Sequence, residues 1–299
     1  MHVSHQEVLR RAASAPAVLL GEQHDKAAQH RWQLHVAAGL LALRPGIVMG
    51  FEMFPARLDP VLARWVAGEL SEAEFLEQAE WGTVWGFPAE LYLPLFRFCR
   101  QFAIPMHGLN CRRALVSEVG KEGWEAIAEE NRDGLTPAVP ATPAYRQYLF
   151  SITGGGAPNR KAAGPEDPAF DRFVRAQQVW DRSFACRIAA LRNQPEPPLV
   201  IGIIGRGHLE FGHGTPAQLA DLGITGTQVL LPHLDPAPPA AGLAHALERI
   251  GPGAEGPQLE HRRIVPQHED PPDQRVIAPD RLGRAVLAPE GAARGDIGK

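Results

Sequence analysis

The sequence predicts an α/β fold in which a mainly parallel central sheet is flanked by helices. Short runs rich in valine, isoleucine and leucine alternate with longer segments of helical periodicity, a pattern typical of a parallel sheet covered on both faces. The 299 residues are 44% hydrophobic and 21% charged, which is an ordinary globular composition with enough apolar residues for a core. We therefore expect one large domain with appendages.

Five apolar runs predict the strands, and helical patterns lie between them. From Ala28 to Leu40, apolar residues recur at helical spacing, which predicts a helix over 25–43 and completes one βαβ unit. The predicted strands are residues 17–21, 47–52, 104–109, 199–204 and 227–231.

Helix start signals place three further helices. Ser71 and Glu74 have the spacing of a capping box, which predicts a short helix after Ser71. Asp167 precedes a proline and predicts the start of a long helix that runs to about residue 191. A proline near the start and a glycine at the end bracket another helix within 215–223.

Two segments interrupt the alternation of strands and helices. Residues 120–166 combine helical pieces with proline-rich and glycine-rich stretches, and we interpret them as a helical lid insertion. Prolines and glycines accumulate over 236–299, which predicts an extended or partly disordered tail in which 275–277 and 284–287 could add a strand. The expected organisation is an α/β domain over 1–235 followed by this tail.

Composition excludes several classes of protein. Cys99, Cys111 and Cys186 are far apart and form no CxxC pair, so neither a zinc knuckle nor a secreted disulfide framework is expected. A net charge of −4 argues against nucleic acid as a partner. No apolar run is long enough to span a membrane, and the N-terminal segment has no signal-like apolar region or lipid-bearing cysteine, so we expect a cytoplasmic protein.

Polar residues follow the carboxyl ends of the predicted strands, the edge at which parallel sheets bind ligands. Gly21 ends the first strand and His24 follows three residues later, and the same spacing recurs from Gly205 to His208. Glu52 ends the second strand. We expect the two histidines and Glu52 to meet at one site.

Two kinds of chemistry are open to His24, Glu52 and His208. Two imidazole nitrogens and a carboxylate could hold a divalent metal ion and leave a position for water. The same residues could act without a metal as an acid–base pair. In a purely structural interpretation, each histidine bonds to backbone in a capped turn, and Glu52 forms a salt bridge to Arg112 or Arg113.

Other polar and aromatic residues are weaker candidates. Asp181 shares an otherwise apolar helix face with Phe184 and Ile188, so it is interpreted either as an orienter of one histidine or as part of a buried ion pair. Aromatic residues at Trp81, Trp85 and Tyr92 fit either a pocket for a flat ligand or plain core. Glu22, Asp25, Glu210 and His213 flank the two turns and are expected to be solvated.

Five ordered blocks of sequence resemble the ChaN family, whose members are haem-binding, iron-regulated proteins within the wider Tiki, TraB and erythromycin esterase-like group. The resemblance covers roughly residues 8–235. The blocks are LGEQHD at 20–25, GFEMF at 50–54, LNCR at 109–112, QVWDRSFA at 178–185 and GRGH at 205–208.

This resemblance implies an α/β fold with a helical lid and a homodimer that encloses two stacked haems. Iron would be held by a tyrosine, for which Tyr148 and Tyr145 in the predicted lid are the candidates, and a histidine of the other subunit would assist at the propionates. The cofactor-binding candidates are Tyr148, Tyr145, His24, His208 and Arg112.

The wider group implies a different use of the same edge. There His24, Glu52 and His208, with Asp181 as orienter, would carry out metal-dependent or acid–base hydrolysis. Whether the chain is an enzyme therefore stays open at this point, as does the choice between haem and a divalent metal. ChaN-like proteins are typically lipoproteins, whereas this N-terminal segment lacks the lipid-bearing cysteine. In either case the partner is a small-molecule ligand.

Overall fold

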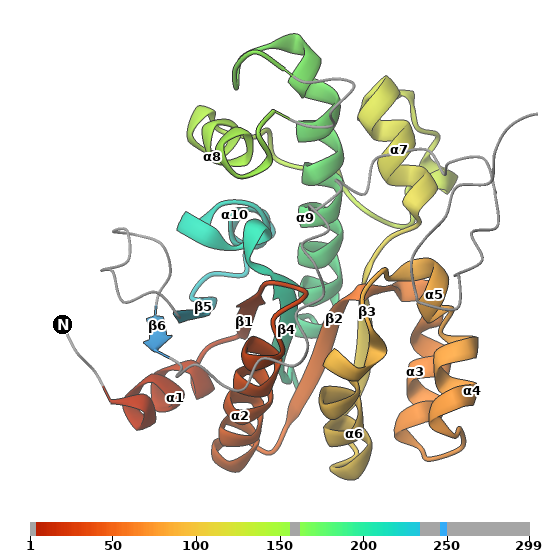
Figure 1. Cartoon of the computed structure of the whole chain (residues 1–299), viewed down its shortest axis with the longest axis vertical. Coiled ribbons are helices and arrows are strands. Elements are labelled where there is room, and N and C mark those ends of the chain that lie inside the picture. The colour runs from red at the N-terminus through yellow and green to blue at the C-terminus, as the bar shows by residue number, and fades with distance from the viewer. Residues whose placement is uncertain (1–3, 156–161, 234–245, 250–299) are drawn as a thin grey trace, which may run out of the picture.

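A computed structural model describes residues 4–155, 162–233 and 246–249, which form a six-stranded sheet with helices on both faces (Figure 1). All five pairings between neighbouring strands are parallel, and the order across the sheet is β3-β2-β4-β1-β5-β6. The strands are β1 (Ala17–Glu22), β2 (Ile47–Pro55), β3 (Met106–Asn110), β4 (Leu199–Gly205), β5 (Gln228–His233) and β6 (Ala246–Arg249). The predicted fold class is thus confirmed.

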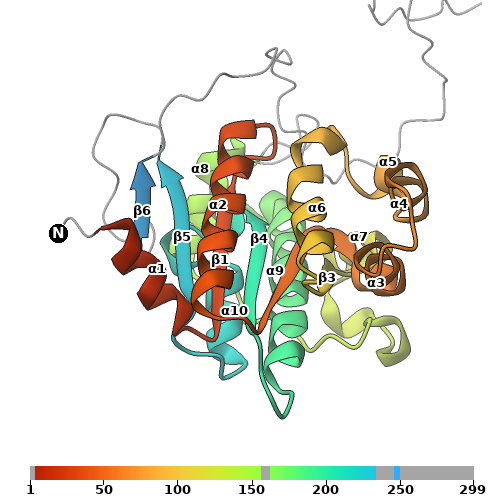
Figure 2. The ribbon, with the colours of Figure 1, turned by 90° about the horizontal axis from the view of Figure 1, so that it is seen from below.

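The part of the chain that is described contains ten α-helices. They are α1 (His5–Ala13), α2 (Ala27–Leu43), α3 (Asp59–Val66), α4 (Glu72–Gln78), α5 (Trp81–Val84), α6 (Leu93–Gln101), α7 (Arg113–Glu122), α8 (Pro143–Thr153), α9 (Asp171–Arg192) and α10 (Thr215–Asp221). Figure 2 shows α2 and α6 on one side of the sheet and α9 on the other.

The two sides of the sheet belong to two apolar cores, which explains why the central strands are hydrophobic throughout. Successive side chains of a strand point to opposite faces. Val18 and Leu20 of β1 accordingly lie in the core that contains α2 and α6, whereas Ala17 and Leu19 lie in the core that contains α7 and α9. With both faces covered, every residue of β1 is buried.

Local capping signals are borne out with small shifts. Ser71 Oγ accepts the Glu74 amide at 3.3 Å while the Glu74 carboxylate accepts the Ser71 amide at 2.8 Å, so α4 begins with the predicted capping box. Asp167 instead caps a short 3₁₀ turn, accepting the Ala169 amide at 2.9 Å, and the long helix α9 begins four residues later at Asp171.

The segment predicted as a lid contains α8, which lies beside the first turns of α9 (Figure 1). Tyr145 and Leu149 of α8 pack with Phe170 and Val174 in a third, smaller core. This contact ties α8 to α9 at the end of the helix that faces the carboxyl edge of the sheet.

One strand was not expected. β6 lies within the segment predicted as an extended tail and pairs in parallel with β5, with Leu230 opposite Ala246. The short run ALER has no strand-like alternation, so its pairing depends on the exposed edge that β5 offers. The two pieces suggested as further strands, 275–277 and 284–287, lie outside the described residues. No helix of the described ranges is long and apolar enough to cross a membrane.

We predict that Gly21→Ala destabilises the fold. A Cβ at Gly21 would lie 2.1 Å from Leu231 Cδ2 in the packed core, so the leucine must move. Urea denaturation should show a loss of about 2 kcal/mol in the free energy of unfolding, the usual effect of overpacking. The control is Gly46→Ala, whose Cβ would meet no atom within 4 Å. Equal stability of the two variants would contradict the packing at Gly21.

Candidate functional site

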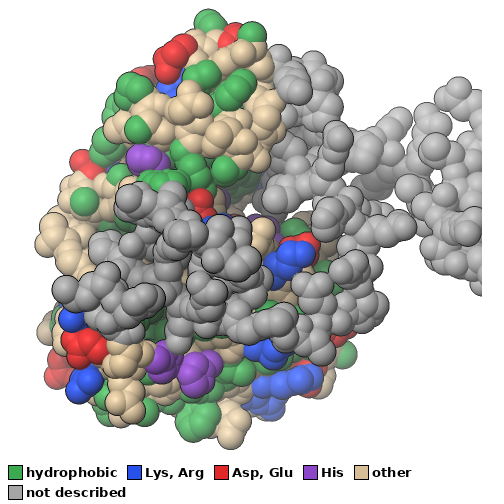
Figure 3. Space-filling model, turned by 60° about the vertical axis from the view of Figure 1, so that its left-hand side comes forward, with side chains coloured by type: hydrophobic (Ala, Val, Ile, Leu, Met, Phe, Trp, Pro, Cys, Tyr) green, Lys and Arg blue, Asp and Glu red, His purple; other side chains and the backbone are tan. Residues whose placement is uncertain are grey.

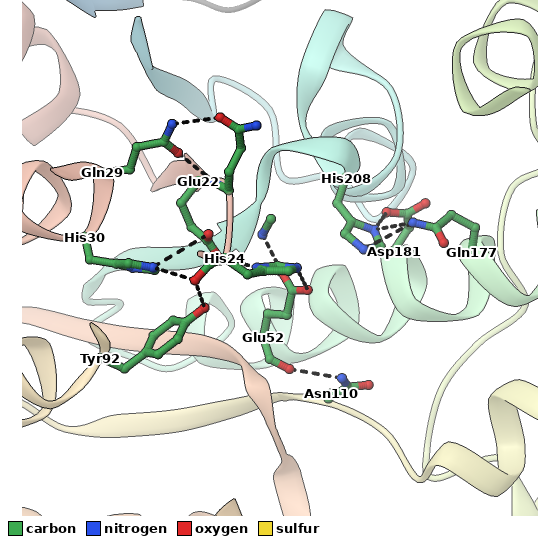
Figure 4. A network of polar contacts seen from close by, with 12 residues as sticks. Glu22, His24, Gln29, His30, Glu52, Tyr92, Asn110, Gln177, Asp181 and His208 are labelled. Atoms are coloured by element: carbon green, nitrogen blue, oxygen red, sulfur yellow. Dashed lines mark hydrogen bonds and ion pairs between the residues drawn. The ribbon is translucent and has the colours of Figure 1, made fainter. Parts of the chain in front are cut away.

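Strand pairing brings the predicted histidines and Glu52 to one edge of the sheet. β4 lies between β1 and β2, and Glu22 at the end of β1 is in register with Gly205 at the end of β4. His24 and His208 therefore follow the carboxyl ends of two adjacent strands, at the same edge of the sheet. Glu52 of β2 lies at this edge as well. Figure 4 shows an ion pair between His24 and Glu52, and beside it a second group in which His208 contacts Asp181 and Gln177.

His24 is held between two carboxylates. Its Nδ1 lies 2.6 Å from Glu22 Oε1, and its Nε2 lies 3.8 Å from Glu52 Oε1. The rings of Trp85 and Phe87 pack against the imidazole at centroid distances of 4.8 and 5.0 Å. Burial by itself would lower the pKa of His24, but the charge and hydrogen bond of Glu22, with a smaller contribution from Glu52, outweigh it and raise the pKa to about 9.

A backbone amide holds the carboxylate of Glu52. Its Oε2 accepts the Gly205 amide, and His24 supplies the nearby positive charge. A side chain at Gly205 would not fit, because a Cβ there would lie 2.8 Å from His24 Cε1 and 3.3 Å from Glu52 Oε2. The alternative in which Arg112 pairs with Glu52 is wrong, since Arg112 Nε donates to Asp133 at 2.5 Å.

His208 forms a second histidine–carboxylate pair with Asp181 of α9. Its Nδ1 lies 2.7 Å from Asp181 Oδ1, and Tyr145 donates its hydroxyl to Asp181 Oδ2 at 2.6 Å. Asp181 is fully buried. Burial lowers the pKa of His208, but the charge and hydrogen bond of Asp181 outweigh it, and Glu52 adds to the net increase. The interaction of His208 with Glu52 and His24 links the two pairs electrostatically.

Histidine–carboxylate pairs can transfer protons, and the same pairing also orients histidines that bind a metal. Within the described part of the chain, no group of three or more His, Cys, Asp or Glu residues is placed to hold a metal ion. The donor set His24, Glu52 and His208 therefore gives no support to the divalent metal that the sequence left open.

Two buried acids were missed by the sequence analysis. Glu22 and Glu210 were expected to be solvated, but they are only 2% and 7% exposed. For Glu22 a signal existed, because it directly follows an apolar strand as Glu52 does. Glu210 lies in a 3₁₀ turn without a periodic pattern, so nothing in the sequence marked it. Asp25 is exposed and His213 partly exposed, as expected.

Tyr148, the second tyrosine of α8, forms a hydrogen bond with Glu210. Tyr148 donates its hydroxyl to Glu210 Oε2 at 2.8 Å, and Arg206 pairs with the other carboxylate oxygen. The Tyr148 ring contacts the rings of Phe211 and His213 at centroid distances of 5.6 and 6.1 Å. Phe211 has a left-handed backbone (φ 59°) and is 36% exposed.

Ile152, one helical turn after Tyr148, is 51% exposed. We call Tyr148, Ile152, Phe211 and His213 the aromatic patch. Figure 3 shows one face of the molecule, on which hydrophobic side chains lie close to a histidine in the upper part of the view. Of the earlier aromatic candidates, Trp81 and Tyr92 lie in the core, and Trp85 both belongs to that core and packs against His24.

The fold and this edge define an α/β protein whose parallel sheet ends in two histidine–carboxylate pairs beneath a tyrosine-bearing helix. The sequence profile of the family described as "haem-binding uptake, Tiki superfamily, ChaN" matches residues 8–219, and the chain belongs to this family.

The fold is shared with a solved structure of this family. ChaN of Campylobacter jejuni, a structure described as showing cofacial haem binding, is 18% identical, with 79% of this chain and 88% of that chain covered and a TM-score of 0.59. A mutant of the erythromycin esterase EreC in its open conformation is a weaker match at 12% identity, with coverage of 80% and 77% and a TM-score of 0.46. No curated protein sequence matches the chain significantly.

We predict that the His24 imidazole titrates near pH 9 in NMR spectra of the folded protein. Because this pKa lies above the ordinary value of 6.5, the pairing stabilises the fold fully below about pH 6.5, and that stabilisation is lost as the pH rises through about 9. Glu22→Gln should lower the pKa of His24, because it removes the negative charge that outweighs the effect of burial. A His24 pKa that does not change in this variant would contradict the role of Glu22.

Proposed function

We propose that this protein binds haem at the aromatic patch, with the Tyr148 oxygen as the axial ligand of the iron. The observation that carries the proposal is the position of Tyr148, whose hydroxyl bonds to Glu210 next to the exposed apolar side chains of Phe211 and Ile152. Family membership and the haem complex of the Campylobacter jejuni relative support haem as the ligand.

The chemistry of Tyr148 fits an iron ligand. Bound haem supplies an iron centre that a phenolate oxygen can ligate. Burial and the charge of Glu210 raise the pKa of Tyr148, so the free phenol stays protonated. Glu210 already accepts its hydrogen bond and is the group that can take the proton when the oxygen becomes a ligand. Phe211 and Ile152 offer the apolar surface that a porphyrin face requires.

Tyr145 fits this role less well. It is 4% exposed, and its hydroxyl is committed to Asp181, which also holds His208. Its ring lies parallel to that of Tyr148 at a centroid distance of 6.4 Å and an interplanar angle of 17°. We infer that Tyr145 supports the Tyr148 ring rather than binding iron. The homodimer, the role in iron handling and the cytoplasmic location expected from the sequence stay predictions.

Hemin titration tests the proposal. We expect a saturable Soret band with a tyrosinate-type spectrum in the wild type. Tyr148→Phe should weaken binding by more than the roughly 10- to 100-fold effect of changing an outer-shell partner of a metal, because it removes the ligand itself. Glu210→Gln should weaken binding less.

Tyr145→Phe is the matched control, since it removes the neighbouring phenol hydroxyl from the same helix. Its complex should retain the tyrosinate bands. Loss of those bands in Tyr145→Phe together with their retention in Tyr148→Phe would reverse the assignment, and no saturable binding by the wild type would refute haem as the ligand.

A second candidate function is hydrolysis by acid–base catalysis, and the two histidine–carboxylate pairs favour it. His24 between Glu22 and Glu52, and His208 on Asp181, combine proton donors with acceptors at one edge. His24 is 22% exposed, so a small substrate can reach it. In this function Glu52 would orient water or accept its proton, and His208 would donate to the leaving group.

We expect such an activity to survive EDTA and to fall about 100-fold in His24→Gln or His208→Gln, the usual contribution of a general acid or base. Hydrolysis of p-nitrophenyl acetate and of a lactone provides the assay. His107→Gln is the control, because His107 also pairs with a carboxylate, Asp59 at 3.2 Å, but on the edge strand β3. Equal rates in all four proteins would exclude these histidines from the reaction.

A further inference from the structure

A third histidine, His30, lies behind His24 and belongs to neither of the two histidine–carboxylate pairs. It comes from the first turn of α2 and is only 3% exposed. Figure 4 shows its ring directed toward the carboxylate of Glu22 and the carbonyl oxygen of His24. His30 therefore contacts both partners of the first pair from the protein interior.

Both ring nitrogens of His30 face hydrogen-bond acceptors. Its Nε2 lies 3.1 Å from the carbonyl oxygen of His24, and its Nδ1 lies 3.2 Å from Gln33 Oε1. The orientation of the Gln33 amide is fixed, because its Nε2 donates to the carbonyl oxygen of Leu20 at 2.8 Å. A neutral imidazole has a single N–H and would place a lone pair against one of these two oxygens, whereas an imidazolium ion donates to both.

The buried carboxylates also favour a positive charge on His30. Glu22 Oε1 bonds to His24, whereas Glu22 Oε2 is buried and has no hydrogen-bond partner in the described part of the chain. His30 Nε2 lies 3.9 Å from this second oxygen. If His30 is charged, Glu22 and Glu52 face two imidazolium ions. If His30 is neutral, one of the two buried negative charges has no counterpart, which is costly.

Tyr92 covers the ring of His30 and adds no charge. The two ring centroids are 4.3 Å apart, and the Tyr92 hydroxyl donates to the carbonyl oxygen of His24 at 3.4 Å. Burial and the charge of Glu22 raise the pKa of Tyr92 well above its ordinary value, so the phenol stays neutral. Glu52 and Asp25 act on both His24 and Tyr92 through their charges.

We propose that His30 is a positioning residue that carries a proton on both ring nitrogens and holds ionised Glu22 in place for His24. The charge of Glu22 is then shared between two imidazolium ions, and the charge of His30 opposes protonation of His24. His24 therefore releases its proton more readily than it would with Glu22 alone. A less tightly held proton suits general acid–base catalysis, because the best catalytic pKa lies near the working pH. The inference rests on the acid–base role of His24 in the second candidate function.

¹⁵N NMR of the full chain tests the charge of His30 directly. The two ring nitrogens of an imidazolium ion have similar chemical shifts, whereas those of a neutral imidazole are widely separated. We expect the imidazolium pattern for His30 at neutral pH. The signals are assigned through the backbone of α2, so this measurement needs no variant. A neutral pattern would overturn the inference.

His30→Gln tests whether His30 acts on His24. Glutamine can still donate to the carbonyl oxygen of His24 but carries no charge. The pKa of His24 should therefore rise above its value of about 9, by about one pH unit for the loss of one nearby like charge. An unchanged or lower pKa of His24 in the folded variant would count against the inference and overturn it.

Gln29→Leu is the matched control. Gln29 holds the same turn without a charge, because it accepts the Gln23 amide at 2.6 Å and donates to Gln23 Oε1 at 3.0 Å. Its loss should loosen the turn without raising the pKa of His24. An equal rise in Gln29→Leu would assign the effect to loosening of the turn and refute the role of His30.

Neither NMR measurement needs a substrate. A failure to detect hydrolysis would therefore refute the second candidate function, whereas a neutral His30 or an unshifted His24 would refute the positioning role. The two results are distinguishable in the same protein.

Discussion

A buried carboxylate requires a positive charge or hydrogen-bond donors, and the carboxyl edge of this sheet holds four of them: Glu22, Glu52, Asp181 and Glu210. Each has a specific partner in the structure. Glu22 is paired with His24, and Glu52 accepts the Gly205 amide. Asp181 is paired with His208, and Glu210 accepts the Tyr148 hydroxyl. The parallel order β2-β4-β1 makes these contacts possible, because it brings three strand ends together near α8 and near the middle of α9, where Asp181 lies.

The same pairing separates two kinds of chemistry at one edge. Histidines paired with carboxylates can transfer protons, whereas the phenol of Tyr148 is the iron ligand that we propose. The two regions are not isolated from each other. Tyr145 donates to Asp181 of one pair and stacks on Tyr148 of the aromatic patch. Tyr145 therefore contacts both regions.

Much of this arrangement could be predicted from sequence, because apolar strands followed by Gly-x-x-His have few ways to fold. The strand positions, the capping box at Ser71 and the placement of His24, Glu52 and His208 at one edge follow from local patterns. Burial of Glu210 and the partner of Arg112 do not, since both depend on the path of loops with no periodicity. The strand β6 could not be predicted either, because it forms by pairing with the edge of β5 and not from a pattern of its own.

In the proposed haem complex, the buried carboxylates keep His24 and His208 paired while the haem iron binds at α8. A crystal structure of the hemin complex tests this most directly. We expect iron bonded to the Tyr148 oxygen, with His24 still bonded to Glu22 and His208 still bonded to Asp181. Iron bonded to either histidine, or haem bound away from α8, would contradict it.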